Sequence, residues 1–201
     1  FQFNVIDALN PDLILANKEE NYKEGIETLQ TKYPVWVSDI VTWEHSLAFI
    51  RDIGKLRDKE NEAERMVTAI ETSFSSLIPQ QREFSVLYLI WKKPWMGAAS
   101  GTFIHTMLSK SGLNNSLHAL ARYPELSDQQ IAALSPDVIF LSSEPFPFKE
   151  RHVAEIKLIA PHAHIMLVDG EMFSWHGSRQ MKAASYIKTI LQELSDKCKS
   201  K

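Results

Sequence analysis

Residues 59–78 read KENEAERMVTAIETSFSSLI, and the rest of the chain is organised around this stretch. Its apolar residues recur at steps of three and four, which predicts one long amphipathic helix that ends before Pro79. They are Ala63, Met66, Val67, Ile70, Phe74 and Leu77. At roughly 1.5 Å per residue the helix would run about 30 Å, enough to join two small lobes. A surface helix on a single domain would show the same pattern, so the flanking sequence must decide.

The composition indicates a globular protein. Of the 201 residues, 44% are hydrophobic and 23% are charged, which suffices for one large domain or two small ones. The net charge of −3 argues against a nucleic-acid or polybasic membrane-surface role. Cys198 is the only cysteine, which excludes an internal disulfide and a cysteine metal site. Without a run of eighteen apolar residues, we expect no membrane insertion.

Strand and helix patterns alternate along the whole chain, which is typical of an α/β protein with parallel sheets. The predicted strands are residues 13–16, 35–37, 85–91, 138–141 and 165–168, and the predicted helices are residues 3–9, 21–32, 42–56, 102–111, 127–135, 149–160 and 178–194. Thr42 can cap one helix, and Ser127 with Gln130 forms a capping-box pattern at another. The predicted buried side of the last helix is Met181, Ala184, Tyr186, Ile187 and Ile190.

A seven-residue segment occurs twice. ALNPDLI at residues 8–14 returns as ALSPDVI at residues 133–139, 125 positions later. Each copy ends a predicted helix and begins a predicted strand, and Pro34 and Pro161 follow at nearly the same spacing. Pro-Asp before a strand is common loop chemistry, yet the continued match favours a duplicated α/β architecture.

The two copies differ in what precedes them. Ser85 lies 51 positions before Pro136, whereas Phe1 lies only 10 before Pro11, a difference of 41. The first copy is therefore either a naturally shorter lobe or the remainder of a truncated one. We favour truncation, because a helix at the start of the chain would have little to pack on. The expected organisation is an incomplete N-terminal lobe at residues 1–57, a linking helix at 58–79 and a C-terminal lobe at 80–201.

No catalytic motif is evident. The segment GAASG at residues 97–101 lacks the Lys-Ser/Thr ending of a phosphate loop, and no GxSxG, HExxH or CxxC occurs. His162 and His164 flank Ala163 before a predicted strand and could bind a metal, although solvated positions at the sheet edge are the simpler interpretation. We predict no catalytic residue, no protein metal site and no cofactor.

Aromatic residues gather just after the predicted strands. Loops that follow parallel strands meet at one edge of a sheet, where α/β folds bind ligands. Such loops carry Trp91, Trp95, Tyr123, Phe146, Phe148, Phe173 and Trp175, with Glu171 and His176 beside them and Asn17 in the first half. Each ring could instead be a core side chain. Together with the loop prolines they favour a preformed pocket for a large flat or apolar ligand. Three rings burying about 100 Å² each would contribute roughly 7 kcal/mol before association costs.

Six segments carry a family resemblance. They are PDLILANKEENYKEGIETL, PVWVSD, YLIWKKPWMGAASGTFIHTML, RYPELS, SPDVIFLSSEPFPF and LVDGEMFSWHGSR. Together they resemble the helical-backbone (class III) substrate-binding proteins of ABC importers, especially the cobalamin and iron-chelate group. The resemblance covers residue 3 to about residue 191. It implies two Rossmann-like lobes joined by a rigid helix, a ligand held in the cleft between them, delivery to a membrane permease, and no chemistry.

The resemblance also assigns residues. It implies cleft-facing positions for Trp95, Tyr123, Glu171 and Trp175. Asn17 stands where cobalamin binders often have an aromatic residue, which weakens a cobalamin assignment. The acidic residues that dock such proteins on their permease would fall near Asn4 and Gln129, so Asp128 and Glu125 are the nearest candidates for docking.

The expected function is capture of a cobalamin-like or iron-chelate ligand, meaning a siderophore or haem, by a monomeric solute-binding protein of an ABC importer. It would work in the periplasm or on a lipid anchor, with its signal outside this chain; a cytoplasmic location is left open. One alternative is an α/β enzyme that acts on a nucleotide or sugar. The other is a non-transport sensor or interaction module that kept the fold.

Overall fold

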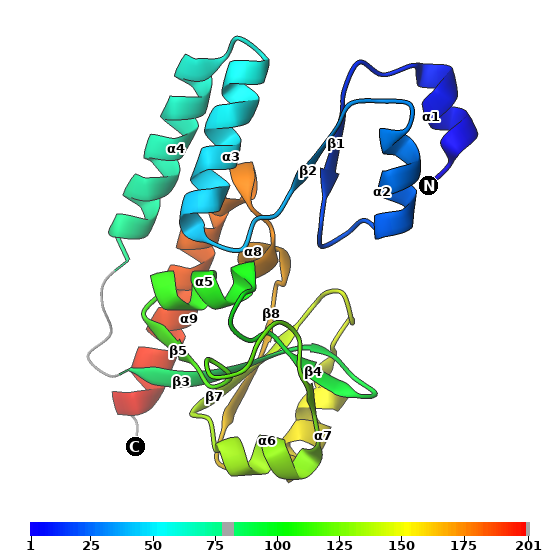
Figure 1. Cartoon of the computed structure of the whole chain (residues 1–201). Helices are drawn as coiled ribbons and strands as arrows, with labels where there is room; N and C mark the ends of the chain where they lie inside the picture. The colour runs from blue at the N-terminus through cyan, green and yellow to red at the C-terminus, as the bar shows by residue number, and fades with distance from the viewer. Residues whose placement is uncertain (78–82, 200–201) are drawn as a thin grey trace. The chain divides into compact units, whose positions relative to one another are not determined.

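Two compact units make up the chain in the computed structural model, and both are α/β as predicted (Figure 1). The first comprises Phe1–Ile40 and the second Val41–Lys201. The structure describes residues 1–77 and 83–199. No helix within those residues is both long and apolar enough to cross a membrane.

The first unit consists of two helices and a two-stranded parallel sheet. Its elements are α1 (Phe3–Leu9), β1 (Ile14–Asn17), α2 (Lys23–Gln30) and β2 (Val35–Ser38). Ile14 lies opposite Val35 in the sheet. None of the residues of α1 is buried, and the side chain of Leu15 in β1 is exposed. Lys32 and Tyr33 donate hydrogen bonds to the carboxylate of Asp7 at 2.7 and 2.8 Å, which ties α1 to the end of α2.

The second unit contains a six-stranded sheet. Its elements are α3 (Trp43–Leu56), α4 (Glu60–Ser75), β3 (Phe84–Trp91), β4 (Trp95–Gly97), α5 (Phe103–Lys110), β5 (Leu113–Asn115), β6 (Glu125–Leu126), α6 (Asp128–Leu134), β7 (Val138–Ser142), α7 (Glu150–Ile159), β8 (His164–Val168), α8 (Glu171–Ser174), the 3₁₀ turn η1 (Gly177–Arg179) and α9 (Gln180–Lys199). The strand order is β6-β4-β3-β7-β8, and β5 also pairs with β3.

The prediction of parallel strands is confirmed for the centre of this sheet. Strands β5, β3, β7 and β8 pair in parallel, while β4 runs antiparallel to both β3 and β6. Strands β4, β5 and β6 were not predicted, because segments of two or three residues are too short to show a periodic pattern. Strands β3 and β7 read as nearly continuous apolar runs, as is typical of parallel strands buried on both faces, and nearly all of their residues are buried.

The repeat predicted from sequence is confirmed. Helix α1 ends at Asn10 and helix α6 ends at Ser135, and both residues are left-handed, with φ of 44° and 43°. Each is followed by Pro-Asp and then by a strand, a helix and a second parallel strand. The left-handed residue stops the helix and redirects the chain into the strand. The predicted helix caps are also present: Thr42 accepts from His45, and Ser127 with Gln130 makes the capping box.

The helix predicted at residues 59–78 is α4, and four of the six residues of its predicted apolar stripe are buried (Figure 1). Met66 is half-buried, and the helix ends at Ser75, so Leu77 lies beyond it. Ala63, Val67, Ile70 and Phe74 are buried, and α4 packs against α3 and α9. A Cβ atom on Gly54 of α3 would lie 2.5 Å from the Cβ of Ala63, so these two helices approach closely there. Ile78 lies outside the described residues. Helices α3 and α4 both belong to the second unit, because the division of the chain falls after Ile40. The lobe boundaries at residues 57 and 80 and the linking role of residues 58–79 stay predictions.

One predicted burial is wrong. Met181 is exposed, whereas the neighbouring Gln180 is fully buried. The 3₁₀ turn Gly177–Arg179 precedes α9, so the helix begins at Gln180 and its inward positions continue through Ala184, Ile187 and Leu191. Met181 lies one residue out of phase with that stripe.

Candidate functional site

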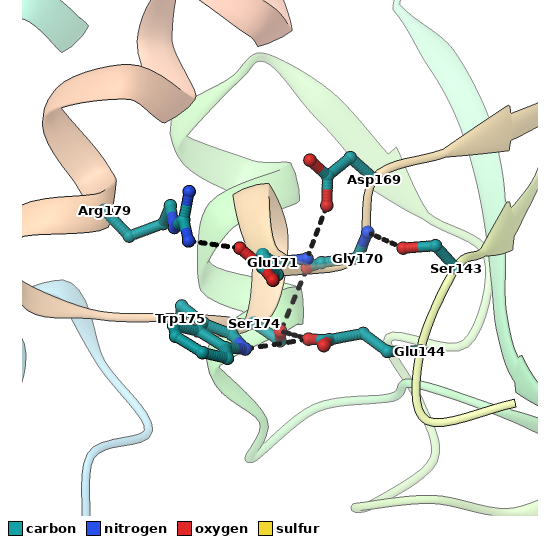
Figure 2. A network of polar contacts seen from close by, with 8 residues as sticks. All are labelled: Ser143, Glu144, Asp169, Gly170, Glu171, Ser174, Trp175 and Arg179. Atoms are coloured by element: carbon teal, nitrogen blue, oxygen red, sulfur yellow. Dashed lines mark hydrogen bonds and ion pairs between the residues drawn. The ribbon is translucent and has the colours of Figure 1, made fainter. Parts of the chain in front are cut away.

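Polar side chains follow β7 and β8 at the carboxyl edge of the second unit's sheet, where the sequence predicted a site (Figure 2). Ser143 and Glu144 come directly after β7, and Asp169 and Gly170 come directly after β8. The backbone N–H of Gly170 donates to Ser143 Oγ at 2.9 Å. Asp169 Oδ1 accepts from the backbone N–H of Glu171 at 3.1 Å and holds the first turn of α8. These bonds join the two loops into one network.

Trp175 is the exposed aromatic ring of this network, and its orientation is fixed (Figure 2). Its side chain is 49% exposed, yet its indole Nε1 donates to Glu144 Oε1 at 2.9 Å. The same carboxylate oxygen accepts from Ser174 Oγ at 2.7 Å. The guanidinium of Arg179 lies 5.4 Å from the centre of the Trp175 ring and forms an ion pair with Glu171. A ring held at its edge and by a neighbouring cation can stack a flat ligand with little loss of side-chain entropy.

Gly170 makes room for Glu144. A Cβ atom at this position would lie 2.4 Å from Ser142 Oγ and 2.5 Å from Glu144 Cγ. Contacts this short do not occur between real Cβ atoms and their neighbours, so a side chain at this position would displace one of the two groups. The bend of the Glu144 side chain toward α8 therefore depends on a glycine after β8.

A second aromatic group surrounds the loops after β3 and β7. The rings of Trp95 and Phe148 stack with centroids 6.3 Å apart, and Phe146 contacts Trp91 and Phe148 at 5.7 and 4.8 Å. Phe148 is buried, whereas Trp91 is 39% exposed. Trp95 and Phe146 are half-buried and pack against the core cluster under the sheet. Trp91 is thus the ring of this group that solvent reaches most readily.

Charged and titratable groups frame this second group. Lys92 pairs with Glu155, and its hydrogen bond holds the pKa of that carboxyl below its usual value. His152 is buried against Phe146 and Phe148, and burial lowers its pKa. Its Nδ1 accepts from the backbone N–H of Lys149 at 2.8 Å, as the neutral ring allows. The role of His152 here is therefore to cap α7.

Two predicted ligand contacts belong to the core instead. Phe173 is fully buried, with its ring centre 5.3 Å from that of Tyr88 and 5.7 Å from that of Phe140. Phe148 is buried under Trp95. Both follow strands, as predicted, but their side chains turn toward the sheet. They are core residues, and we leave them out of the site.

Two further candidates are half-buried. His176 lies between Phe49 and Phe103, at 5.5 and 6.2 Å between ring centres, and burial lowers its pKa. Tyr123 lies beside Arg122, whose guanidinium is 5.5 Å from the ring centre.

The remaining candidates lie elsewhere. Asn17 ends β1 in the first unit, and its Oδ1 accepts from the backbone N–H of Glu19 at 2.7 Å. Glu125 is exposed in β6. Asp128 is the first residue of α6 and accepts a hydrogen bond from the indole Nε1 of Trp95 at 2.8 Å. A residue predicted for ligand binding and one predicted for docking are therefore hydrogen-bonded to each other.

Of the eight residues drawn in Figure 2, sequence reasoning named only Glu171 and Trp175 as site residues. It missed six: Ser143, Glu144, Asp169, Gly170, Ser174 and Arg179. The rule that located the rings, a side chain placed just after a strand, would also have found Glu144. Nothing in the sequence pairs it with Trp175, because the two lie 31 positions apart. Among the described residues no group of three or more His, Cys, Asp or Glu side chains could hold a metal ion.

Comparisons with known proteins agree on the fold. The profile of a family described as periplasmic binding protein matches residues 3–160. A periplasmic heme-binding protein from Roseiflexus sp. RS-1 is similar in structure, with a TM-score of 0.79 and 16% identity over 94% of this chain and 79% of that one. The periplasmic vitamin B12 binding protein of Vibrio cholerae has a TM-score of 0.71 and 19% identity over 96% of this chain and 78% of that one.

A third similar structure is described as an ABC-type Fe³⁺-hydroxamate transport system from Saccharomonospora viridis. Its TM-score is 0.69 and its identity 18%, over 92% of this chain and 70% of that one. The search of curated protein sequences found no match. At these identities the structural likeness supports the fold, and the ligands named belong to those proteins.

Proposed function

Because this chain belongs to the periplasmic binding protein family, we propose that it is the solute-binding component of an ABC importer. The proposed ligand is a cobalamin-like or iron-chelate compound, such as haem or a ferric siderophore. The proposed role is capture and delivery to a permease, without chemical change of the ligand. We place the protein in the periplasm or on a lipid anchor outside the cytoplasmic membrane, and we expect a monomer.

The observation that carries this proposal is the fixed, half-exposed ring of Trp175 at the carboxyl edge of the sheet. An indole in solvent usually rotates freely, whereas this one is held by Glu144 and flanked by Arg179. A rigid ring beside hydrogen-bond acceptors suits a large flat ligand with polar substituents. Three structures of similar fold belong to proteins described as binding heme, vitamin B12 or transporting Fe³⁺-hydroxamate, which supports the same class of ligand.

The proposed ligand contacts are the accessible side chains at this edge. They are Trp175 and Glu171 from the segment after β8 and Trp91 from the end of β3, with Trp95, Tyr123, Phe146 and His176 as half-buried neighbours. Glu125 and Asp128 stay proposed docking residues for the permease. Because Asp128 accepts from Trp95, docking there would compete with that hydrogen bond.

Titration of the chain with cyanocobalamin, haemin and a ferric hydroxamate, followed by tryptophan fluorescence and calorimetry, tests the proposal. Saturable binding of at least one of them is expected. Trp175→Ala should raise the Kd roughly 70-fold, because about 100 Å² of ring surface at ~25 cal/mol/Å² contributes about 2.5 kcal/mol.

A matched control is Leu158→Ala, which removes an apolar side chain that is 87% exposed on α7. It should leave the Kd unchanged. Absence of binding to all three compounds would refute the proposed function, and an equal loss in both variants would remove Trp175 from the site.

A further inference from the structure

Glu144 has two carboxylate oxygens with different surroundings. Oε1 accepts both recorded hydrogen bonds, from Ser174 Oγ and from Trp175 Nε1. Within residues 1–77 and 83–199, no recorded hydrogen bond reaches Oε2. The side chain is half-buried beside the exposed ring of Trp175. One oxygen therefore fixes the ring, and the other remains available as an acceptor next to it.

The charge around this oxygen is negative. The network drawn in Figure 2 contains the carboxylates of Glu144, Asp169 and Glu171 and a single guanidinium, that of Arg179. Arg179 is paired with Glu171. A ligand carboxylate stacked on Trp175 would thus meet like charge, which is unfavourable where water is partly excluded. A ligand with N–H or O–H donors or with positive charge would instead gain a charge-assisted hydrogen bond.

We propose that Glu144 is a positioning and specificity-determining residue, which orients the Trp175 ring and selects chelates whose rim carries hydrogen-bond donors over chelates whose rim carries carboxylates. This inference rests on the proposed function of the same site. Among flat macrocycles it favours a corrinoid, whose peripheral groups are amides, over haem, whose peripheral groups are two propionates.

The substitution Glu144→Gln separates the two roles of the side chain. The glutamine carbonyl oxygen can still accept from Ser174 and Trp175, while its NH₂ group replaces the available acceptor with a donor. Glu144→Ala removes both roles. Glu150→Gln, at an exposed position in α7, changes the net charge by the same amount outside the network and serves as the control.

The experiment measures the Kd values of cyanocobalamin and haemin for each variant, together with the ¹H–¹⁵N signal of the Trp175 indole without ligand. In Glu144→Gln the ratio of the two Kd values should shift by about tenfold toward haemin, as loss of a hydrogen bond to a charged group predicts. Its indole signal should stay in place. In Glu144→Ala the indole signal should move and exchange faster, and both ligands should weaken. Glu150→Gln should match the wild type.

Three outcomes overturn the inference. If both compounds bind and Glu144→Gln leaves their ratio unchanged, the selectivity is wrong while the proposed function stands. If the indole signal of Glu144→Ala matches the wild type, Glu144 does not position Trp175. If the wild type binds neither compound, the inferred selectivity is refuted. The proposed function is refuted as well only if ferric hydroxamates also fail to bind. Circular dichroism of Glu144→Ala checks that the variant is folded.

Discussion

The two copies of the repeat follow the same path but differ in burial. The copies are α1-β1-α2-β2 and α6-β7-α7-β8. In each, a helix ends in a left-handed residue, and Pro-Asp, a strand, a second helix and a parallel strand follow. Every residue of β7 is buried, whereas β1 has no buried residue. Strand β7 lies between β3 and β8, but β1 pairs only with β2 in the described part of the chain. The local sequence therefore sets the route of the chain, and the neighbouring strand sets how much each residue contributes to stability.

The largest expected difference between the copies is in the strands. Phe140 in β7 is fully buried and Leu15, at the matching position in β1, is 49% exposed. Phe140→Ala should lower the free energy of unfolding of the second unit by about 3–5 kcal/mol because it leaves a cavity. Leu15→Ala should cost about 1 kcal/mol or less in the first unit. Denaturant unfolding, with hydrogen exchange to assign each unit, measures both. Equal losses would mean that β1 is as well covered as β7.

The second largest difference in the free energy of unfolding is expected for the aspartates that precede β7 and β1. Asp137 Oδ2 accepts from the backbone N–H and Oγ of Ser85 at 2.9 and 2.8 Å, whereas Asp12 is exposed and no recorded hydrogen bond reaches it within residues 1–77 and 83–199. Asp137→Ala should cost about 1–3 kcal/mol, because it leaves a half-buried N–H without its partner. Asp12→Ala should stay within about 0.5 kcal/mol of the wild type. A comparable cost in both variants, by the same unfolding measurement, would contradict the role of Ser85.

Glycine substitutions at the left-handed helix ends should have a smaller effect, and they should raise the free energy of unfolding or leave it unchanged, whereas the substitutions above lower it. Asn10 and Ser135 both adopt a left-handed conformation, which asparagine tolerates better than serine does. Ser135→Gly should therefore raise the free energy of unfolding by about 0.5 kcal/mol, and Asn10→Gly should leave it nearly unchanged. Thermal unfolding can measure this gain. Destabilisation by Ser135→Gly would show that the serine hydroxyl matters more than the backbone conformation.

The smallest expected effect is acid sensitivity confined to the first copy. Hydrogen bonds from Lys32 and then Tyr33 hold the pKa of the exposed Asp7 carboxyl below its usual value, and the matching position in α6 is Ala132. A lowered pKa in the folded state means that Asp7 adds stability above the unfolded pKa of about 3.9, and that this is lost as the pH falls through the folded value. An NMR titration of the Asp7 carboxyl should give the lowered pKa. Asp7→Asn should remove this pH dependence.

The sequence predicted the route of the chain better than its site. Periodicity located every long helix and every central strand, because these elements bury one continuous side. It could not find the short strands β4, β5 and β6, or the 3₁₀ turn that precedes the exposed Met181. At the candidate site, the rule that ligand contacts follow strands selected Trp91, Glu171 and Trp175, which are exposed or half-buried and stay proposed ligand contacts. It also selected Phe148 and Phe173, because a one-dimensional pattern does not say whether a loop residue turns outward or back onto the sheet.

Gly170 has a consequence for how this protein can change over generations. Every missense mutation at codon 170 adds a Cβ atom, which would lie within 2.5 Å of Ser142 Oγ and Glu144 Cγ. In a deep mutational scan selected on ligand uptake, all nineteen replacements at this position should therefore be depleted, alanine included. Codon 170 thus offers natural selection almost no neutral variation, although the residue itself has no side chain with which to touch a ligand.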